Sequence, residues 1–161
     1  MAQNHDHRYE VRLRWTGDRG TGTSAYTAYG RDHVVSAAGK PDLPGSSDRV
    51  FRGDADRWNP EELLVAALSQ CHLLAYLHEC VKAGVVVTGY TDAPSGTMQT
   101  DAEGGGHFTE VTLRPAVTVA DPAMAEQAQA LHDEAHHHCF IASSVNFPVR
   151  HQPSVQVAAT P

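Results

Sequence analysis

Three cysteines and eleven histidines are the residues of this 161-residue chain that could do chemistry. Cys71 and Cys80 are nine residues apart in the sequence. On one helix, that spacing places them about 180° apart around the axis and about 13–14 Å apart along it. They therefore cannot share a site within that helix. We predict that Cys80 is a core residue, whereas Cys71 is either a small apolar core residue or a reactive thiol.

Cys139 follows three consecutive histidines at the end of a predicted helix, where a side chain can face a cavity. Two thiols far apart in the sequence can form a disulfide during turnover if they meet in space. One of them then needs a lowered pKa, because the thiolate is the nucleophile. An arginine is the cation best suited to lower the pKa of such a thiol, since it stays charged and can bond bidentately.

The histidines also raise the question of a metal site. His132 and His136 have the i, i+4 spacing of one helical face, and Cys139 lies one turn further on. Zinc accepts such ligands. However, the chain has neither an HExxH motif nor a paired-cysteine motif, and the end of a helix favours histidine through its dipole. We therefore predict no metal, with a site at these three residues as the alternative.

A long helix over residues 60–83 must position Cys71. Asn59 is a good N-cap, Pro60 suits the first helical position, and Gly84 supplies the stop. A helix of 24 residues is about 36 Å long. Its apolar residues cover almost the whole circumference, which is typical of a helix that is buried on all sides. One small domain can hardly cover such a helix, so we expect a partner subunit.

Strands surround this helix in the sequence. Residues 9–15 alternate strictly, which predicts a half-buried strand with one apolar face. That face would hold Tyr9, Val11, Leu13 and Trp15. Further strands are predicted at 24–29, 33–36, 85–90, 96–100, 107–119 and 145–158, a long surface loop at 37–58, and a second helix from Asp121 toward His138. This order predicts an α+β fold with a mainly antiparallel sheet, in a single domain over residues 1–161.

Composition excludes several classes of protein. The chain has 12 Lys+Arg against 19 Asp+Glu and a net charge of -7, so it lacks the basic surface that nucleic acid requires. Three cysteines cannot form a fully paired disulfide framework. The start of the chain lacks the apolar core of a signal peptide, and the apolar stretch at 63–78 is too short and too polar to span a bilayer. We expect a cytoplasmic protein with no nucleic-acid or membrane partner.

The run from Asn59-Pro60-Glu61 to Gln70-Cys71-His72 closely resembles the helix motif of the OsmC/Ohr family, the osmotically inducible and organic hydroperoxide resistance proteins. The resemblance extends to the turn at 15–18, the strand at 85–87 and the segment at 135–149 around Cys139. It implies an OsmC-like fold. In that fold an intertwined homodimer has the two long helices at its centre and its sites at the subunit interface.

The resemblance further implies a thiol peroxidase that acts on organic hydroperoxides, with hydrogen peroxide as a further possible substrate, and that needs no cofactor. On the family pattern, Cys71 would attack the peroxide and become a sulfenic acid. Cys139 would resolve it as a Cys71–Cys139 disulfide, which an external dithiol then reduces. Members of the family often carry Pro after the second cysteine, whereas this chain has Phe140.

Glu61 matches the family's acidic residue, which partners an arginine near the reactive thiol. We choose Arg52 as that arginine. Its competitors are Arg49, Arg57 and Arg19. Glu61 and Cys71 are ten residues apart, or about 15 Å along a continuous helix. If both serve one site, Glu61 therefore comes from the other subunit. The alternative function is a noncatalytic, stress-related protein that binds a small apolar ligand in the dimer cleft, with structural cysteines.

Overall fold

The computed structural model describes residues 5–159. The chain forms two compact units, Met1–Leu63 and Leu64–Pro161, and α1 begins in the first and continues through the second. The single domain predicted over residues 1–161 stays a prediction.

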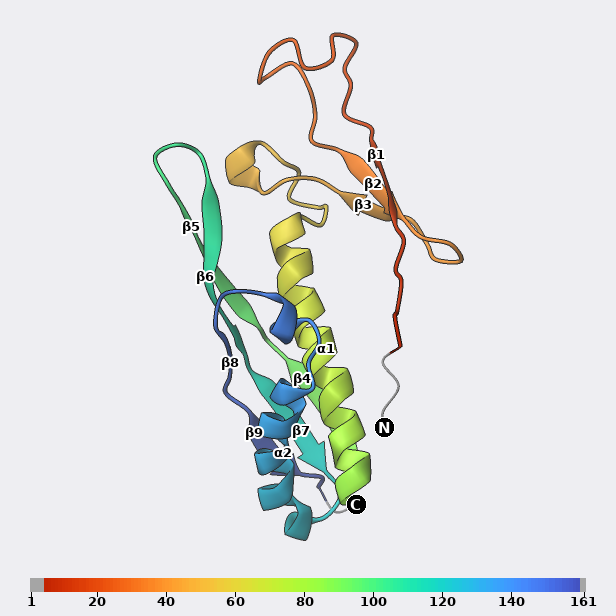
Figure 1. The fold of residues 1–161 in the computed structure, drawn as a ribbon, viewed down its shortest axis with the longest axis vertical. Helices are drawn as coiled ribbons and strands as arrows, with labels where there is room; N and C mark the ends of the chain where they lie inside the picture. Colours follow the sequence, from red (N-terminus) through yellow and green to blue (C-terminus); the bar gives the residue numbers. More distant parts are fainter. Residues whose placement is uncertain (1–4, 160–161) are drawn as a thin grey trace. The chain divides into compact units, whose positions relative to one another are not determined.

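The first unit is built on a three-stranded antiparallel sheet in the order β1-β2-β3, drawn in orange in Figure 1. Its strands are β1 (Arg12–Trp15), β2 (His33–Ser36) and β3 (Leu43–Gly45). The predicted strand at 24–29 is wrong, because these residues form turns whose carbonyls accept bonds from Arg31. The predicted loop at 37–58 is also more ordered than expected, since it contains β3 and a 3-10 turn at Arg49–Phe51.

The apolar face predicted for the first strand is present, but it is not buried within the chain. Tyr9 is 89 % exposed, Val11 70 % and Leu13 67 %. The strand forms because β2 pairs with it. Trp15 packs against Tyr29, whereas Tyr9, Val11 and Leu13 are mostly exposed. This part of the burial prediction is wrong for a single subunit.

The long helix α1 (Pro60–Ala83) has the predicted bounds, and its ends explain them. The N–H of Glu62 donates to Asn59 Oδ1 at 2.8 Å, and the N–H of Asn59 donates to Glu62 Oε2 at 3.3 Å. This reciprocal pair is a capping box with Asn in the usual Ser/Thr position. At the other end, Gly84 adopts a φ of 72°, which favours glycine and ends the helix.

The prediction that α1 is buried on all sides is wrong for the single chain. One stripe is buried, and it comprises Leu68, His72, Tyr76, Glu79 and Cys80. On other faces, Leu74 is 67 % exposed and Val81 77 %. By length and composition α1 also meets the criterion for a membrane span, unlike the shorter stretch judged above, but core helices of soluble proteins meet it too.

Two three-stranded sheets form the rest of the second unit, in the orders β4-β7-β9 and β5-β6-β8. Their strands are β4 (Val87–Asp92), β5 (Ser95–Thr100), β6 (Gly106–Leu113), β7 (Pro115–Val119), β8 (Val149–His151) and β9 (Ser154–Val157). The pairs β4/β7 and β5/β6 are antiparallel, whereas β6/β8 and β7/β9 are parallel. The α+β class is confirmed. The strand predicted at 107–119 is divided into β6 and β7, and the one at 145–158 into β8 and β9.

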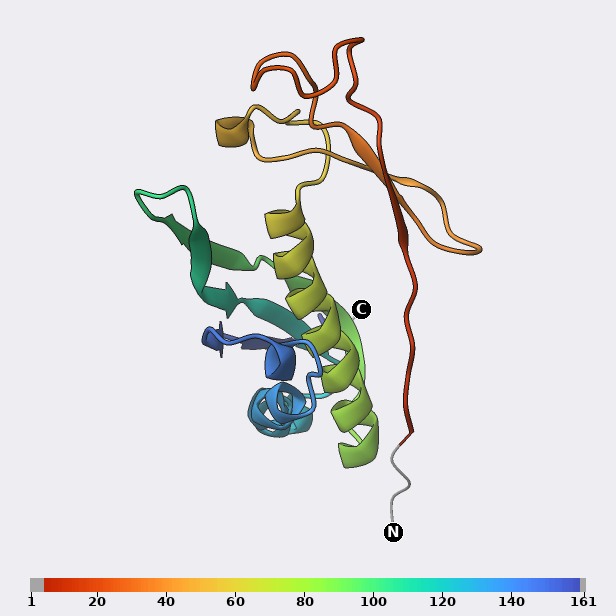
Figure 2. The ribbon, with the colours of Figure 1, turned by 45° about the horizontal axis from the view of Figure 1, so that its top comes forward.

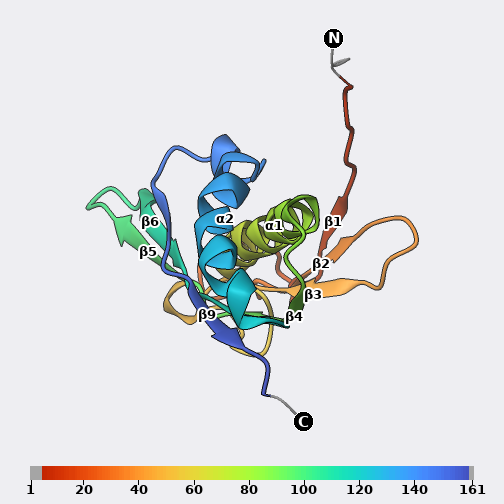
Figure 3. The same cartoon turned by 90° about the horizontal axis from the view of Figure 1, so that it is seen from below.

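The second helix, α2 (Ala125–His137), follows a 3-10 turn at Pro122–Met124 that Asp121 caps. Figures 2 and 3 show α2 (blue) beside the C-terminal half of α1 (green). The Tyr76 hydroxyl on α1 donates to the Ala128 carbonyl on α2 at 3.0 Å, and both helices pack on β7 through a shared apolar cluster. This packing brings the end of α2, and Cys139 just after it, against α1.

Candidate functional site

Cys71 and Cys139 meet in the second unit, although they are 68 positions apart in the sequence. The Cys71 side chain lies close enough to Cys139 to affect its pKa, and adjacent backbone amides contact the two sulfurs. The N–H of Ile141 donates to Cys71 Sγ at 3.5 Å, and the N–H of Ala142 donates to Cys139 Sγ at 3.4 Å. Each sulfur therefore has a backbone donor of its own, and at Cys139 the amides of Ala142 and Ile141 oppose the rise in pKa that burial causes.

The chain after α2 forms a tight turn that directs these two amides toward the sulfurs. The Ser143 N–H and hydroxyl both donate to the Cys139 carbonyl, at 3.0 and 3.1 Å, and a 3-10 turn at Ala142–Ser144 follows. Consecutive N–H groups in such a turn point to one side, where they form a small anion-binding concavity. The turn thus suits the negative charge of a sulfur that has lost its proton.

The three cysteines differ in their access to solvent. Cys71 is partly exposed and lines a pocket, whereas Cys139 is 1 % exposed. Burial, with a smaller contribution from the hydrogen bond to Cys71, raises the pKa of Cys139 to about 11. Cys80 is 2 % exposed inside an apolar cluster, and burial raises its pKa too. Cys80 is therefore a core residue, as predicted, and Cys71 is the thiol that a small molecule can reach.

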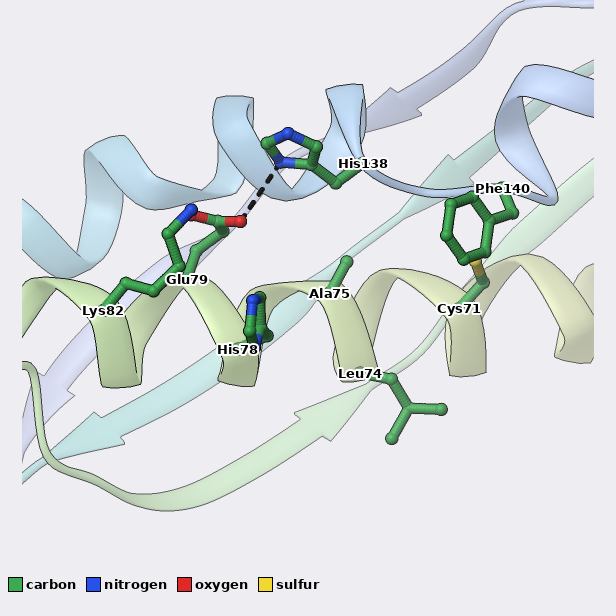
Figure 4. Close-up of a pocket in the computed structure, with 8 residues that line it drawn as sticks. All are labelled: Cys71, Leu74, Ala75, His78, Glu79, Lys82, His138 and Phe140. Atoms are coloured by element: carbon green, nitrogen blue, oxygen red, sulfur yellow. Dashed lines mark hydrogen bonds and ion pairs between the residues drawn. The ribbon is translucent and has the colours of Figure 1, made fainter. Parts of the chain in front are cut away.

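The pocket beside Cys71 has a volume of about 420 Å³, which is enough for a small organic molecule. Six of its lining residues form one stripe of α1, namely Cys71, Leu74, Ala75, His78, Glu79 and Lys82. His138 and Phe140 complete it. Figure 4 shows Cys71 and Phe140 at one end and Lys82 at the other. The end near the thiol is therefore mainly apolar, and the far end is polar.

A buried carboxylate, missed in the sequence, organises that polar end. Glu79 has a side chain only 7 % exposed; Lys82 Nζ donates to its Oε2 at 2.7 Å, and His138 Nδ1 lies 3.1 Å from its Oε1. The hydrogen bond from Lys82 lowers the pKa of Glu79, and the charge of His138 adds to this. The i, i+3 spacing of Glu79 and Lys82 in an apolar helix was the available signal.

Glu61 lies in the first unit, at a cavity of about 330 Å³ that Arg31 also lines. Glu61 Oε2 is buried and has no hydrogen-bond partner among the described residues. The Arg31 guanidinium donates to the carbonyls of Tyr29 and Tyr26, at 2.7 and 3.0 Å, and lies 4.1 Å from the centre of the Tyr29 ring. The cavity thus brings together a carboxylate in need of a partner and a firmly held cation.

The four arginines considered from the sequence lie elsewhere in the first unit, and none of them lines this cavity. Arg52 is exposed and ends the 3-10 turn at Arg49–Phe51 with a left-handed φ of 67°. Arg57 forms ion pairs with Asp32 and Asp54 and shares a different cavity with Arg49. Arg19 lies beside Gly30. Arg52 as the partner of the thiol therefore stays a prediction, and Arg31 is a candidate that sequence reasoning missed.

The three residues weighed as metal ligands have separate partners. His132 is hydrogen-bonded to His72, His136 packs against His151, and Cys139 contacts Cys71. Within residues 5–159, no group of three or more His, Cys, Asp or Glu side chains is arranged to hold a metal ion.

A long helix that presents a thiol to a second thiol, over small three-stranded sheets, defines a class of α+β proteins with a paired-cysteine site. Comparison with protein families identifies the family, because the model of the OsmC-like protein family matches residues 53–154. The chain belongs to the OsmC-like family. The resemblance seen in the sequence is confirmed.

Solved structures agree with this assignment. An OsmC-like protein of unknown function from Vibrio cholerae is 30 % identical, with a TM-score of 0.79, over 92 % of this chain and 100 % of its own. Organic hydroperoxide resistance proteins from Elizabethkingia anophelis and Legionella pneumophila are 20 % and 21 % identical, both with a TM-score of 0.67. They match over 96 % and 94 % of this chain and all of their own, and they show the shared fold. A comparison with curated proteins finds no match.

Proposed function

We propose that the protein is a cysteine-based peroxidase that reduces organic hydroperoxides, with hydrogen peroxide as a possible second substrate. One observation carries the proposal: a thiol on the wall of an open pocket, Cys71, contacts a buried second thiol, Cys139. The accessible thiol can meet a substrate, and the buried one can meet only its neighbour. That division of roles is what a peroxidatic and a resolving cysteine require.

The reaction balances with these two thiols and an external dithiol. The Cys71 thiolate attacks one peroxide oxygen, the O–O bond breaks, and the alkoxide takes a proton to leave as an alcohol. The Cys139 thiolate then attacks the sulfenic sulfur of Cys71, and the hydroxyl leaves as water. The dithiol reduces the resulting disulfide by two exchange steps and is itself oxidised.

The mechanism needs Cys71 as a thiolate, and a nearby arginine would stabilise that negative charge. We assign this role to Arg31 together with Glu61, because these two residues line one cavity and Glu61 Oε2 has no hydrogen-bond partner among the described residues. Arg52, favoured from the sequence, is the alternative. The shape of the pocket supports an organic substrate, because the wall next to Cys71 is formed by Leu74 and Ala75.

We further propose that the site forms in an intertwined homodimer. Two apolar surfaces lack cover in the single chain, the outer face of β1 and the side of α1 that carries Leu74 and Val81. A second copy would bury both. Since Glu61 and Cys71 are ten residues apart on one helix, the Glu61 that serves a given thiol would come from the partner.

Consumption of cumene hydroperoxide with dithiothreitol as the reductant tests the function. We expect turnover by the wild-type protein, none by Cys71→Ser, and normal turnover by the matched control Cys80→Ser. Mass spectrometry after peroxide treatment should find a Cys71–Cys139 disulfide. A wild-type protein that consumes no peroxide, or a fully active Cys71→Ser variant, would exclude the peroxidase. Either result would favour the noncatalytic protein that binds a small apolar ligand.

A further inference from the structure

Two histidines form a buried pair next to the thiols. His72 Nε2 and His132 Nδ1 are 2.9 Å apart, and each side chain is 1 % exposed. Their ring planes are 7° apart, so the two imidazoles are nearly parallel. The pair joins α1 to α2 through a polar contact, and the ring of His151 stacks on His72 with the ring centres 5.7 Å apart.

The pair is poorly suited to serve stability alone. His72 Nδ1 and His132 Nε2 are both buried and have no hydrogen-bond partner among the described residues. Since one ring donates in the shared bond and the other accepts, one buried donor and one buried acceptor remain unpaired whichever tautomer is present. Two apolar side chains of the same shape would avoid that penalty. What a buried polar pair adds is a fixed geometry between the two helices.

The position of the pair connects this geometry to the thiols. His72 directly follows Cys71, and His132 lies in the last turns of α2, seven residues before Cys139, which follows the end of that helix. Tyr76, one turn beyond His72, stacks on the His132 ring at 4.0 Å. The hydroxyl of Tyr76 also bonds the Ala128 carbonyl of α2. These contacts fix how far α2 is shifted along α1, and that shift decides where Cys139 lies.

We propose that the His72–His132 hydrogen bond is a positioning device that holds Cys139 against Cys71 for disulfide formation. In catalysis this role rests on the proposed peroxidase function, but the effect on the disulfide itself does not. Neither histidine exchanges atoms with the substrate or the thiols. Each acts through the helix that carries it.

The groups around the pair keep both rings neutral at pH 7, which preserves the hydrogen bond. Burial, reinforced by the charge of His151 from β8, lowers the pKa of His72 to about 4, although Asp92 from β4 opposes this. Burial, together with His72 and His151, lowers the pKa of His132 to about 3 against the opposing charge of Asp133. His136 of α2 also acts against protonation of His72.

The test is the dithiol–disulfide equilibrium of the full-length protein in glutathione buffers. Oxidised glutathione takes two electrons from Cys71 and Cys139, which form the disulfide and give up two protons, and two molecules of reduced glutathione result. For His72→Leu/His132→Leu, which removes the bond without leaving one ring unpaired, we expect the equilibrium constant for the disulfide to fall at least tenfold. A tenfold fall corresponds to a potential about 30 mV less negative. The matched control is His137→Leu on the exposed side of α2, which should match the wild type.

A second measurement separates positioning from general damage. Formation of the Cys71 sulfenic acid is measured in a Cys139→Ser background by trapping with dimedone after peroxide is added. Its rate should stay within about twofold of the wild-type rate even when both histidines are leucine, because that step does not need Cys139. A folded double variant with a wild-type glutathione equilibrium would overturn the proposal. Because the equilibrium uses no peroxide, this failure would leave the proposed peroxidase standing, and a failed peroxidase assay would leave the positioning role standing.

The wild-type protein provides a check that does not depend on any variant folding. The shared imidazole N–H should give a slowly exchanging proton NMR signal in both the dithiol and the disulfide form, because the bond is buried and is needed in both. Loss of that signal on disulfide formation would show that the bond breaks as the thiols join, which contradicts the proposal.

Discussion

Cys139 is buried, yet its proposed role as the resolving cysteine requires its thiol to ionise. Only a thiolate attacks a sulfenic acid efficiently, yet burial raises the pKa of Cys139 to about 11. The Ala142 N–H and the 3-10 turn behind it offset part of this penalty. At neutral pH only a small fraction of Cys139 is therefore ionised, and resolution should be slower than the attack on peroxide.

This predicts a steep pH dependence for disulfide formation. Below the pKa of Cys139, the thiolate fraction and hence the resolution rate should rise about tenfold per pH unit. Single-turnover oxidation with one equivalent of peroxide between pH 6 and 8.5, followed by acid quenching and mass spectrometry, measures this rate. A rate that stays flat across this range would mean that Cys139 is already ionised at neutral pH.

Single substitutions can show whether Arg31 or Arg52 is the cation that stabilises the Cys71 thiolate. If Arg31 supplies the cation, Arg31→Lys should lower kcat/KM by about 10²-fold, because a lysine cannot reproduce the planar contacts of a guanidinium. Arg52→Lys, at an exposed site, should leave activity near the wild-type value and is the matched control. Initial rates with cumene hydroperoxide compare the two. The reverse pattern would restore Arg52 to the role predicted from the sequence.

At the scale of the elements, the sequence predicts local structure well wherever a short motif determines it. The bounds of α1 follow from Asn59, Pro60 and Gly84. The exposed face of β1 could not be predicted, because strict alternation indicates that a face will be buried but not which subunit will bury it. The turns at 24–29 could not be predicted, because Tyr26, Thr27 and Tyr29 are residue types that favour strands.

The residues of the candidate site were likewise predictable from the sequence only in part. Cys71 could be singled out from its motif, and its contact with Cys139 agrees with the family resemblance. Arg31 and Glu79 could not be found, because their roles depend on which backbone carbonyls and side chains the fold brings to them. The histidine pair was hidden for a related reason. His132 was weighed with its helical neighbour His136, whereas its partner, His72, lies on the other helix.

The capping box of α1 gives a prediction at this scale. Asn59→Ala removes the acceptor of the Glu62 N–H and should lower the free energy of unfolding by about 1 kcal/mol. Asn59→Asp keeps an acceptor oxygen at the same place, adds a charge that the helix dipole favours, and should be close to the wild type. Urea unfolding followed by circular dichroism measures both. Equal stability of the two variants would mean that the capping box contributes nothing to the helix.

The stability of the whole molecule should fall in mild acid because of the buried histidines. An unfolded histidine has a pKa of about 6.5, whereas His72 and His132 have pKa values of about 4 and 3 when folded. The unfolded chain therefore binds more protons, and stability is lost as pH falls below 6.5. The loss should be about 2 kcal/mol per histidine between pH 6.5 and 5. Urea midpoints over this range test it, with His72→Leu/His132→Leu expected to lose less.

The assembly of the molecule decides whether the site is complete. If Glu61 serves the Cys71 of the other subunit, a Cys71→Ser chain and a Glu61→Gln chain can complement each other. In a dimer of the two variants, one site combines the intact Cys71 of the Glu61→Gln chain with the intact Glu61 of the Cys71→Ser chain.

Each variant alone should be inactive or nearly so. Mixing them in equal amounts under conditions that exchange subunits should restore about a quarter of the wild-type activity, because half of the dimers are mixed and each of those has one intact site. Peroxide consumption before and after exchange measures this, and mixing Cys71→Ser with itself is the control. Activity that stays at the level of the separate variants would place Glu61 and Cys71 outside any shared site between subunits. Arg31 and Glu61 would then have no role at Cys71, and the Cys71 thiolate would depend on the amide of Ile141.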